Sequence, residues 1–437
     1  MPQPNLTLND PKIVRAWTMY DWANSVYSLV ITSAIFPVYY NAVTTTEAQG
    51  DLVNFLGWEV KNTALQSFAL SFSFLLIAPL LPLLSGIADY IGNKKVFMKF
   101  FVYLGGLACC GLYFFTGPDT LVWGISCFAL ASVGYAGSIV FYDAYLPEIV
   151  TEDRYDITSA RGYSMGYYGS VILLVVNLAM IIFWEPLGFP SEGLATRFAF
   201  LTVGVWWIAF AQLSFRRLPD NPYNRPASRQ IVLNGYHELR KVWQSLPRYA
   251  NIRMYLWAYF FFNMGVQTIM YLAASFGAKE LRLEDTKLIA TVLLIQLVAA
   301  LGARVFARLS ERKGNRFSLM CMIGIWIVIC AGAYFITNQY EFYAVAFAVG
   351  IVMGGIQSLS RATYSKMIPS NSIDHASYFS FFDVTFNLSI VGGTFCYGLV
   401  EQLTGSMRNS ALALMVFFVI GMLLLTRVKV TNQPTDQ

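Results

Sequence analysis

Charged residues are scarce in this sequence, and their scarcity excludes a water-soluble globular domain. Asp, Glu, Lys and Arg make up 13% of the 437 residues, whereas a soluble domain carries about 25%. Hydrophobic residues make up 56%, so the chain lacks the charge to cover its surface in water. Lipid must therefore be the solvent for much of that surface, and we expect an integral membrane protein.

Signatures of metal sites, enzymes and nucleotide-driven pumps are also missing. Only two histidines occur, His237 and His375, and both lie in polar connecting segments. The six cysteines fall in apolar runs without zinc or disulfide spacing, so we interpret them as packing residues. No phosphate loop or His-Glu-x-x-His sequence occurs. Gly-x-Ser-x-Gly occurs once, at residues 162–166, within a predicted apolar span that contains no histidine. We therefore expect neither an enzyme nor a pump, with no cofactor, no metal and no nucleic-acid partner.

Twelve apolar runs are present that can each cross a bilayer, which requires about 20 mostly apolar residues in a helix. Residues 68–84 are apolar at all positions but Ser71 and Ser73, whereas membrane barrels alternate apolar and polar positions throughout. The predicted fold class is therefore all-α integral membrane. The predicted spans are residues 13–40, 62–85, 96–116, 120–146, 159–184, 197–215, 253–277, 286–308, 317–336, 340–364, 376–400 and 409–426.

Lysine and arginine lie mainly on one side of the predicted spans. If both termini are on the inner side, that side carries all but six of the 30 basic residues. Basic residues concentrate on the cytoplasmic side of membrane proteins, so we expect a multi-pass protein with both termini cytoplasmic, in the plasma membrane if the source is bacterial. The six outer basic residues are Lys61, Arg197, Lys279, Arg282, Lys287 and Arg408.

The longest inner segment divides the predicted spans six and six. We expect an N-terminal bundle over residues 1–215, a cytoplasmic linker over 216–252 and a C-terminal bundle over 253–437. Apolar residues recur at helical spacing within the linker, which predicts an amphipathic helix on the membrane surface that straps the two halves together. These residues are Val232, Tyr236, Leu239, Trp243 and Leu246.

Two short segments repeat, which indicates that the halves are related. Residues 89–94 follow the second span and residues 311–316 follow the eighth, 222 positions later, with an acid, a glycine and a base in matching places. Pro147 and Pro369 share that separation. Two pseudo-symmetric six-helix halves around a site at the membrane midplane form a transporter architecture.

The 89–94 turn resembles the signature loop of the major facilitator superfamily. The resemblance implies that Asp89 helps to latch the inner ends of the two halves and that Glu311 is its copy. Four further segments resemble the subfamily of fungal autophagy-related vacuolar amino-acid effluxers and its uncharacterised bacterial relatives, although Asn387 stands where that subfamily is expected to have lysine. These segments are residues 20–25, 141–148, 159–168 and 357–361.

Polar residues share one helix face in three of the predicted spans. Ionisable and amide side chains are costly in hydrocarbon, so we expect these faces to line a central cavity that binds the solute. Asp21 is the candidate carboxylate for proton coupling or solute binding, because it lies deep in the first span. The candidate binding residues are Asp21, Asn24, Ser28, Asn263, Gln267, Asp383 and Asn387.

Charged residues near the inner ends of the spans predict gating ion pairs. We expect Asp143 to pair with Arg161 in the first half and Arg361 to pair with Asp383 in the second, because each charge would otherwise be uncompensated. Gly162, followed by glycines at 166 and 169, predicts a close-packing face on the fifth span.

The sequence thus favours a secondary active transporter that moves a small polar solute by alternating access. Amino acids are candidate solutes by resemblance, and a proton is the expected coupling ion. We expect a monomer whose partners are the lipid bilayer and the solute. A non-transporting sensor or scaffold on the same fold stays open as the alternative, because a fold alone does not fix function.

Overall fold

The computed structural model describes residues 7–46, 50–220, 231–245, 249–369, 372–404 and 406–430. Within these ranges, eleven helical segments are long and apolar enough to cross a membrane. The helix α10 (Ala250–Leu281), with 32 residues, is the twelfth long helical segment. All twelve predicted spans coincide with these helices, so the predicted all-α membrane fold is confirmed.

The N-terminal group contains the first six spans. The first span consists of α1 (Pro11–Val26), a π-helical segment η1 (Tyr27–Ala34) and α2 (Ile35–Thr44). A hairpin and short helical turns connect the long helices. The long helices are α3 (Asn62–Ile91), α4 (Lys94–Gly111), α5 (Leu121–Asp143), α7 (Tyr155–Ile182) and α8 (Glu192–Phe215); the connecting elements are β1 (Leu52–Phe55), β2 (Trp58–Lys61), η2 (Leu112–Phe114), η3 (Pro118–Thr120), α6 (Leu146–Ile149) and η4 (Glu152–Arg154).

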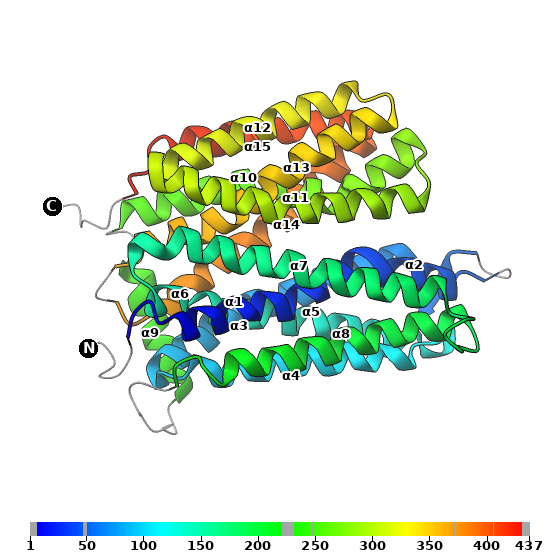
Figure 1. The fold of residues 1–437 in the computed structure, drawn as a ribbon, viewed down its shortest axis with the longest axis horizontal. Coiled ribbons are helices and arrows are strands. Elements are labelled where there is room, and N and C mark those ends of the chain that lie inside the picture. Colours follow the sequence, from blue (N-terminus) through cyan, green and yellow to red (C-terminus); the bar gives the residue numbers. More distant parts are fainter. Residues whose placement is uncertain are drawn as a thin grey trace.

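The C-terminal group begins with α10 and packs beside the first group (Figure 1). Helix α1 begins and α15 ends at the same end of the molecule, which we call the inner end. The remaining helices are α11 (Asp285–Lys313), α12 (Asn315–Phe335), α13 (Gln339–Met367), α14 (His375–Thr404) and α15 (Met407–Leu425).

Six long helices form most of the contact between the two groups. Helix α7 packs against α11 and α13, and α14 packs against α3 and α5. In Figure 1, α7 and α11 run side by side along the boundary. Any site between the groups must therefore draw its side chains from these helices and from α1, which packs against α7.

The first span changes its helical pitch beside the predicted polar face. From Tyr27 to Ala34 the backbone is a π-helix, and the Ser33 hydroxyl donates to the Ser28 carbonyl at 2.9 Å. A π-helical segment inserts an extra residue per turn and is frequent at functional sites. Sequence periodicity did not reveal it, because the polar residues here fit an α-helical spacing.

The predicted linker helix is present as α9 (Ile231–Ser245). It packs against α3 so closely that a Cβ at Gly86 would lie 2.2 Å from the Gly235 carbonyl oxygen. At its other end, Lys241 pairs with Asp374 at 3.0 Å, just before α14. Helix α9 therefore contacts both groups. Linker residues 221–230, Leu246 and the Val232 side chain lie outside the described residues.

Candidate functional site

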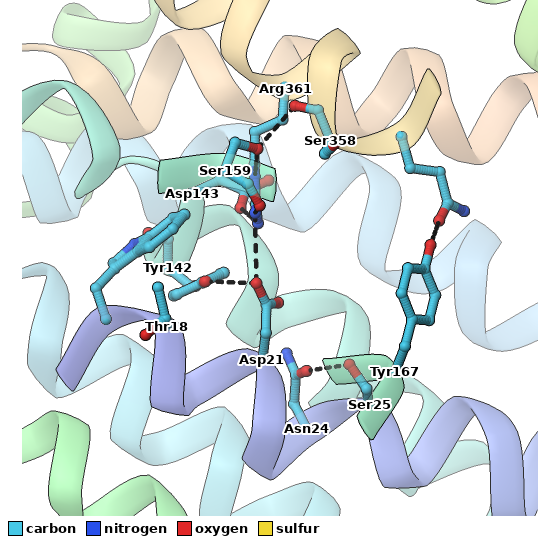
Figure 2. Close-up of polar contacts among 12 residues, drawn as sticks. Thr18, Asp21, Asn24, Ser25, Tyr142, Asp143, Ser159, Tyr167, Ser358 and Arg361 are labelled. Carbon is cyan, nitrogen blue, oxygen red and sulfur yellow. Dashed lines mark hydrogen bonds and ion pairs between the residues drawn. The ribbon is translucent and has the colours of Figure 1, made fainter. Parts of the chain in front are cut away.

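One arginine of the C-terminal group reaches into the N-terminal group. Arg361 is on α13, and its side chain is 2% exposed. Its Nη1 donates to Asp143 at 2.9 Å and its Nη2 to Asp21 at 3.3 Å. Its Nε donates to the Ser159 hydroxyl at 2.9 Å. Figure 2 shows these groups meeting around the guanidinium, so side chains from α1, α5 and α7 converge on one cation.

Aromatic rings enclose the rest of this arginine. The guanidinium carbon lies 4.7 Å from the Trp17 ring centroid and 4.4 Å from that of Tyr163. Tyr142 lies 5.4 Å away, and its hydroxyl donates to Asp21 at 2.7 Å. A planar, weakly hydrated guanidinium suits such a site better than an ammonium, because it stacks on rings while its N–H groups bind carboxylates.

A glycine on α7 makes room for this cluster. A Cβ at Gly162 would lie 2.3 Å from Asp21 Oδ2 and 3.0 Å from Arg361 Nη2. One turn later, a Cβ at Gly166 would lie 2.3 Å from the Ser25 hydroxyl. The predicted close-packing face of the fifth span is therefore confirmed, and its partner is α1.

The expected pairing of charges is wrong in both halves. Asp143 pairs with Arg361 instead of Arg161, and Arg361 does not pair with Asp383. Arg161 is exposed, because neighbouring residues point about 100° apart around a helix and the adjacent Gly162 occupies the packed face. The expectation assumed that charges pair within a half, whereas Arg361 crosses between halves.

At the inner end, Asp89 caps a helix of the opposite group. Its carboxylate accepts from the backbone N–H of Ala376 at 3.2 Å, and from the N–H and hydroxyl of Ser377, both at 2.7 Å. These groups lie in the first turn of α14, where free N–H groups and the helix dipole favour an anion. We call this contact the Asp89 latch; it is the contact that the family resemblance implies.

The corresponding contact in the other half uses different residues. Asp156, at the start of α7, accepts from Ser310 and Asn315, at 2.7 and 2.8 Å, and pairs with Lys366 at 2.7 Å. We call this set the Asp156 latch. Glu311, expected to copy Asp89, is exposed. The donor and acceptor roles are therefore exchanged relative to the Asp89 latch. Here the inner turn of the second half supplies the donors, and the start of α7 supplies the acid.

A third inner contact joins Glu148 to both groups. His375 Nδ1 lies 2.9 Å from Glu148 Oε1, and Lys94 forms an ion pair with the same oxygen. Lys94 lies in the repeated turn, and His375 is the first residue of α14. The Glu148 contact and the Asp89 latch thus share the inner end of α14.

The C-terminal group contains its own buried polar residues. Asn263 Nδ2 donates to the Ser389 hydroxyl at 2.6 Å, and Gln267 donates to Asn263 Oδ1 at 3.2 Å. Asn387 is 5% exposed and Asp383 is 8% exposed. Asp383 Oδ2 is buried without a hydrogen-bond partner. The predicted residues of the seventh and eleventh spans are thus buried in this group.

The remaining predicted residues lie on the first span. Asn24 is buried and accepts from the Ser25 hydroxyl at 3.3 Å, and Ser28 donates to the Ser25 carbonyl. Deeper along α7, the Tyr167 hydroxyl donates to Gln357 of the opposite group at 2.6 Å (Figure 2). Among the described residues, no hydrogen bond joins Asn24 or Ser28 to α10 or α14, so a shared cavity stays a prediction.

Contacts between the groups are distributed unevenly along the helices. In the part of the chain that the structure describes, every hydrogen bond and ion pair between the groups involves the inner half of its helices. The farthest from the inner end joins Tyr167 and Gln357; Ser164 bonds to the Ala300 carbonyl nearby. The structure is therefore closed by polar contacts on the inner side.

Sequence reasoning missed several residues of these contacts. Asp156, Glu148 and Lys366 lie at the ends of spans, where a charge is usually solvated, so depth alone did not single them out. Ser159 is a small polar residue without distinctive spacing. The sequence feature that could have indicated Glu148 and Asp156 is the group of five charged residues within residues 148–156, in a chain with few charged residues.

Among the described residues, twelve long helical segments lie in two groups that are closed on the inner side around a buried ion cluster, and the protein is a transporter of the major facilitator superfamily. The fold is shared with a fucose transporter, FucP, in its outward conformation (TM-score 0.70, 13% identity, 96% of this chain and 99% of that one). It is also shared with the human organic anion transporter MFSD10 (TM-score 0.70, 10% identity, 96% and 100%).

Within this superfamily, the chain belongs to the family described as "Vacuole effluxer Atg22 like", which matches residues 9–157 and 153–437. It is 30% identical over 429 residues to the uncharacterized MFS-type transporter YxiO of Bacillus subtilis, covering 96% of this chain and 97% of that protein. It is 21% identical to autophagy-related protein 22-1 of Aspergillus terreus, covering 85% and 74%.

Proposed function

We propose that the chain is a secondary transporter that moves a small polar solute by alternating access, coupled to protons. Amino acids are the first solutes to test, because the matched family is described as vacuole effluxers and the sequence resembles amino-acid effluxers. We further propose that both termini are cytoplasmic and that the protein works as a monomer, in the plasma membrane if the source is bacterial.

The observation that carries this proposal is the inner-side location of the polar contacts between the two groups. In a carrier of this class, two rigid bundles rock around a central site. The Arg361 cluster and the Asp89 and Asp156 latches then hold the inward-closed state. Each is a discrete set of hydrogen bonds that must break before the inner side opens.

The proposed solute site lies beyond these contacts, away from the inner end. It takes side chains from the first span and from α10 and α14, with Asp21 held in place by Arg361 and Tyr142. The proposed contact residues are Asn24, Ser28, Asn263, Gln267, Asp383 and Asn387.

A solute screen followed by flux measurement tests the proposal. Purified protein is screened by thermal shift against amino acids, peptides, sugars and nucleosides, because a bound ligand raises the melting temperature. Every stabilising compound is then followed, as radiolabel, into proteoliposomes with and without a pH gradient. We expect gradient-dependent flux of an amino acid. Absence of flux for every stabilising compound would contradict transport and favour a sensor.

A further inference from the structure

One buried carboxylate of the C-terminal group has no partner. Asp383 is the ninth residue of α14 (His375–Thr404), about 12 Å from its inner end. It is 8% exposed, and Oδ2 is fully buried with no hydrogen-bond donor. No described residue donates to either oxygen or forms an ion pair with it, so the structure supplies nothing to stabilise a negative charge there.

The residue before this carboxylate packs among aromatic rings. The adjacent Phe382 ring stacks on Tyr259 at 4.3 Å and on Tyr364 at 4.9 Å between centroids. The charged group acting most directly on Asp383 is Asp143, another acid. An isolated carboxylate in such surroundings is costly, and a nearby like charge adds to the cost.

We propose that Asp383 is the residue that binds and releases the coupling proton of this transporter. The inference rests on the proposed function and deepens it. A proton from water adds to a carboxylate oxygen and gives a neutral acid, without any redox change or leaving group. The neutral acid fits the unpartnered position in the inward-closed state, and release of the proton creates a charge that must be solvated as the inner side opens.

The groups that face α14 from the neighbouring helices leave Asp383 without a cation. Arg361 on α13 is bound to Asp143 and Asp21, and Lys241 on α9 is bound to Asp374 near the inner end. Among the described residues, the titratable and charged groups that contact α14 or lie on neighbouring helices include Tyr255 and Tyr259 on α10, Arg361 and Tyr364 on α13, Asp143 on α5, Asp89 on α3, Glu148 on α6 with its partner Lys94, Lys241 on α9 and Arg408 on α15.

Asp21, the carboxylate chosen from the sequence, is in a different situation. It accepts from Tyr142 at 2.7 Å and from Arg361 at 3.3 Å. These two donors favour the charged form of Asp21 relative to an unpartnered carboxylate such as Asp383. We therefore assign Asp21 a positioning role for Arg361, and assign the exchangeable proton to Asp383.

Infrared difference spectroscopy of the purified full-length protein in lipid nanodiscs tests this assignment without any solute. The probe is the proton alone: spectra at acid and alkaline pH are subtracted, and the C=O band of a protonated carboxyl is followed. We expect Asp383→Asn to lose a band that Asp21→Asn and the wild-type protein keep, and Asp383→Glu to restore a shifted band. Monodispersity in size-exclusion chromatography establishes that each variant is folded.

Three results would overturn the assignment: the band persists in Asp383→Asn, it disappears in Asp21→Asn alone, or the wild-type protein shows no titrating band and is instead stabilised by sodium in an Asp383-dependent manner. In proteoliposomes, Asp383→Asn should abolish the dependence of solute uptake on the pH gradient. If the wild-type protein moves no solute while the band titrates at Asp383, the proposed function fails and the proton site stands.

Discussion

The buried acids of this transporter have opposite surroundings in its two halves. In the N-terminal group, Asp21 and Asp143 share the guanidinium of Arg361, and a tyrosine hydroxyl adds a further bond. In the C-terminal group, Asp383 is equally buried and has no such partner. The cation that could neutralise it belongs to the same group but extends into the other one.

This difference distinguishes a fixed cluster of charges in the first half from a single carboxylate in the second half that can gain or lose a proton. A saturated network of buried charges resists change, because removing any member leaves another uncompensated. An unpartnered buried carboxylate favours its neutral form, so it gains a proton in this state and releases it only when its surroundings change. The crossing arginine therefore has two effects: it ties the halves together on the inner side, and it leaves the second half with a carboxylate free to titrate.

Removal of Arg361 should have the largest effect. Arg361→Ala leaves two carboxylates buried without their cation, which costs about 3–5 kcal/mol of stability. We expect a large fall in melting temperature and loss of transport. Arg361→Lys should recover little, because an ammonium cannot bind both acids and stack between rings. Arg312→Ala, an exposed site, is the matched control and should change stability by less than about 0.5 kcal/mol.

A double substitution decides whether the loss comes from the uncompensated acids. Adding Asp143→Asn to Arg361→Ala should recover part of the melting temperature, since one buried charge is removed with its partner. Purely additive losses would show that Arg361 acts through packing instead of charge.

Gly162→Ala should have the next largest effect. Its Cβ would meet Asp21 Oδ2 at 2.3 Å, so the ion cluster must shift, at a cost of about 1–3 kcal/mol. Gly398→Ala, in α14, meets nothing within 4 Å and should be neutral or slightly stabilising, because alanine favours a helix. Equal melting temperatures for the two variants would contradict the close contact between α7 and α1.

Asp156→Ala should weaken the inner closure without dispersing the ion cluster. It removes the acceptor that Ser310, Asn315 and Lys366 share, which costs about 1–3 kcal/mol. On a background without native cysteines, Ser365→Cys should react faster with an impermeant maleimide from the inner side when Asp156→Ala is present. Asp89→Ala should accelerate the reaction less, since water can solvate the freed N–H groups of α14. Unchanged labelling in both variants would show that these latches do not control inner access.

The sequence was sufficient to predict the helices because their cause is local. Each span is a mostly apolar run of bilayer length, and the run at 62–85 became α3 (Asn62–Ile91) with only a few residues added at its inner end. The burial of Asp21, Asn263 and Asp383 followed from the same reasoning, since a polar side chain at that depth must face protein or a cavity.

The pairing of these residues was not predictable in the same way. Arg361 lies 218 residues from Asp143 and 340 from Asp21, and nothing local in either segment reports such a contact. The need to compensate each charge predicted pairing within each half, and the structure shows pairing between halves. The repeat specifies a similar backbone in the two halves but not the same charges at equivalent positions. Glu311 is exposed, and the acid of the corresponding contact is Asp156 on α7.

The smallest expected effect is at Glu311, and it sharpens the contrast between the two latches. By sequence, Glu311 and Asp89 are equivalent, so symmetric halves would make Glu311→Gln and Asp89→Asn similarly harmful. In the structure Glu311 is exposed and the neighbouring Ser310 and Asn315 bind Asp156 instead. Glu311→Gln should therefore change stability by less than about 0.5 kcal/mol, as other surface substitutions do. It should also leave the rate of inner-side labelling unchanged. If it impairs transport while leaving both unchanged, Glu311 must engage a partner only after the inner side opens, and the asymmetry seen here would belong to the closed state alone.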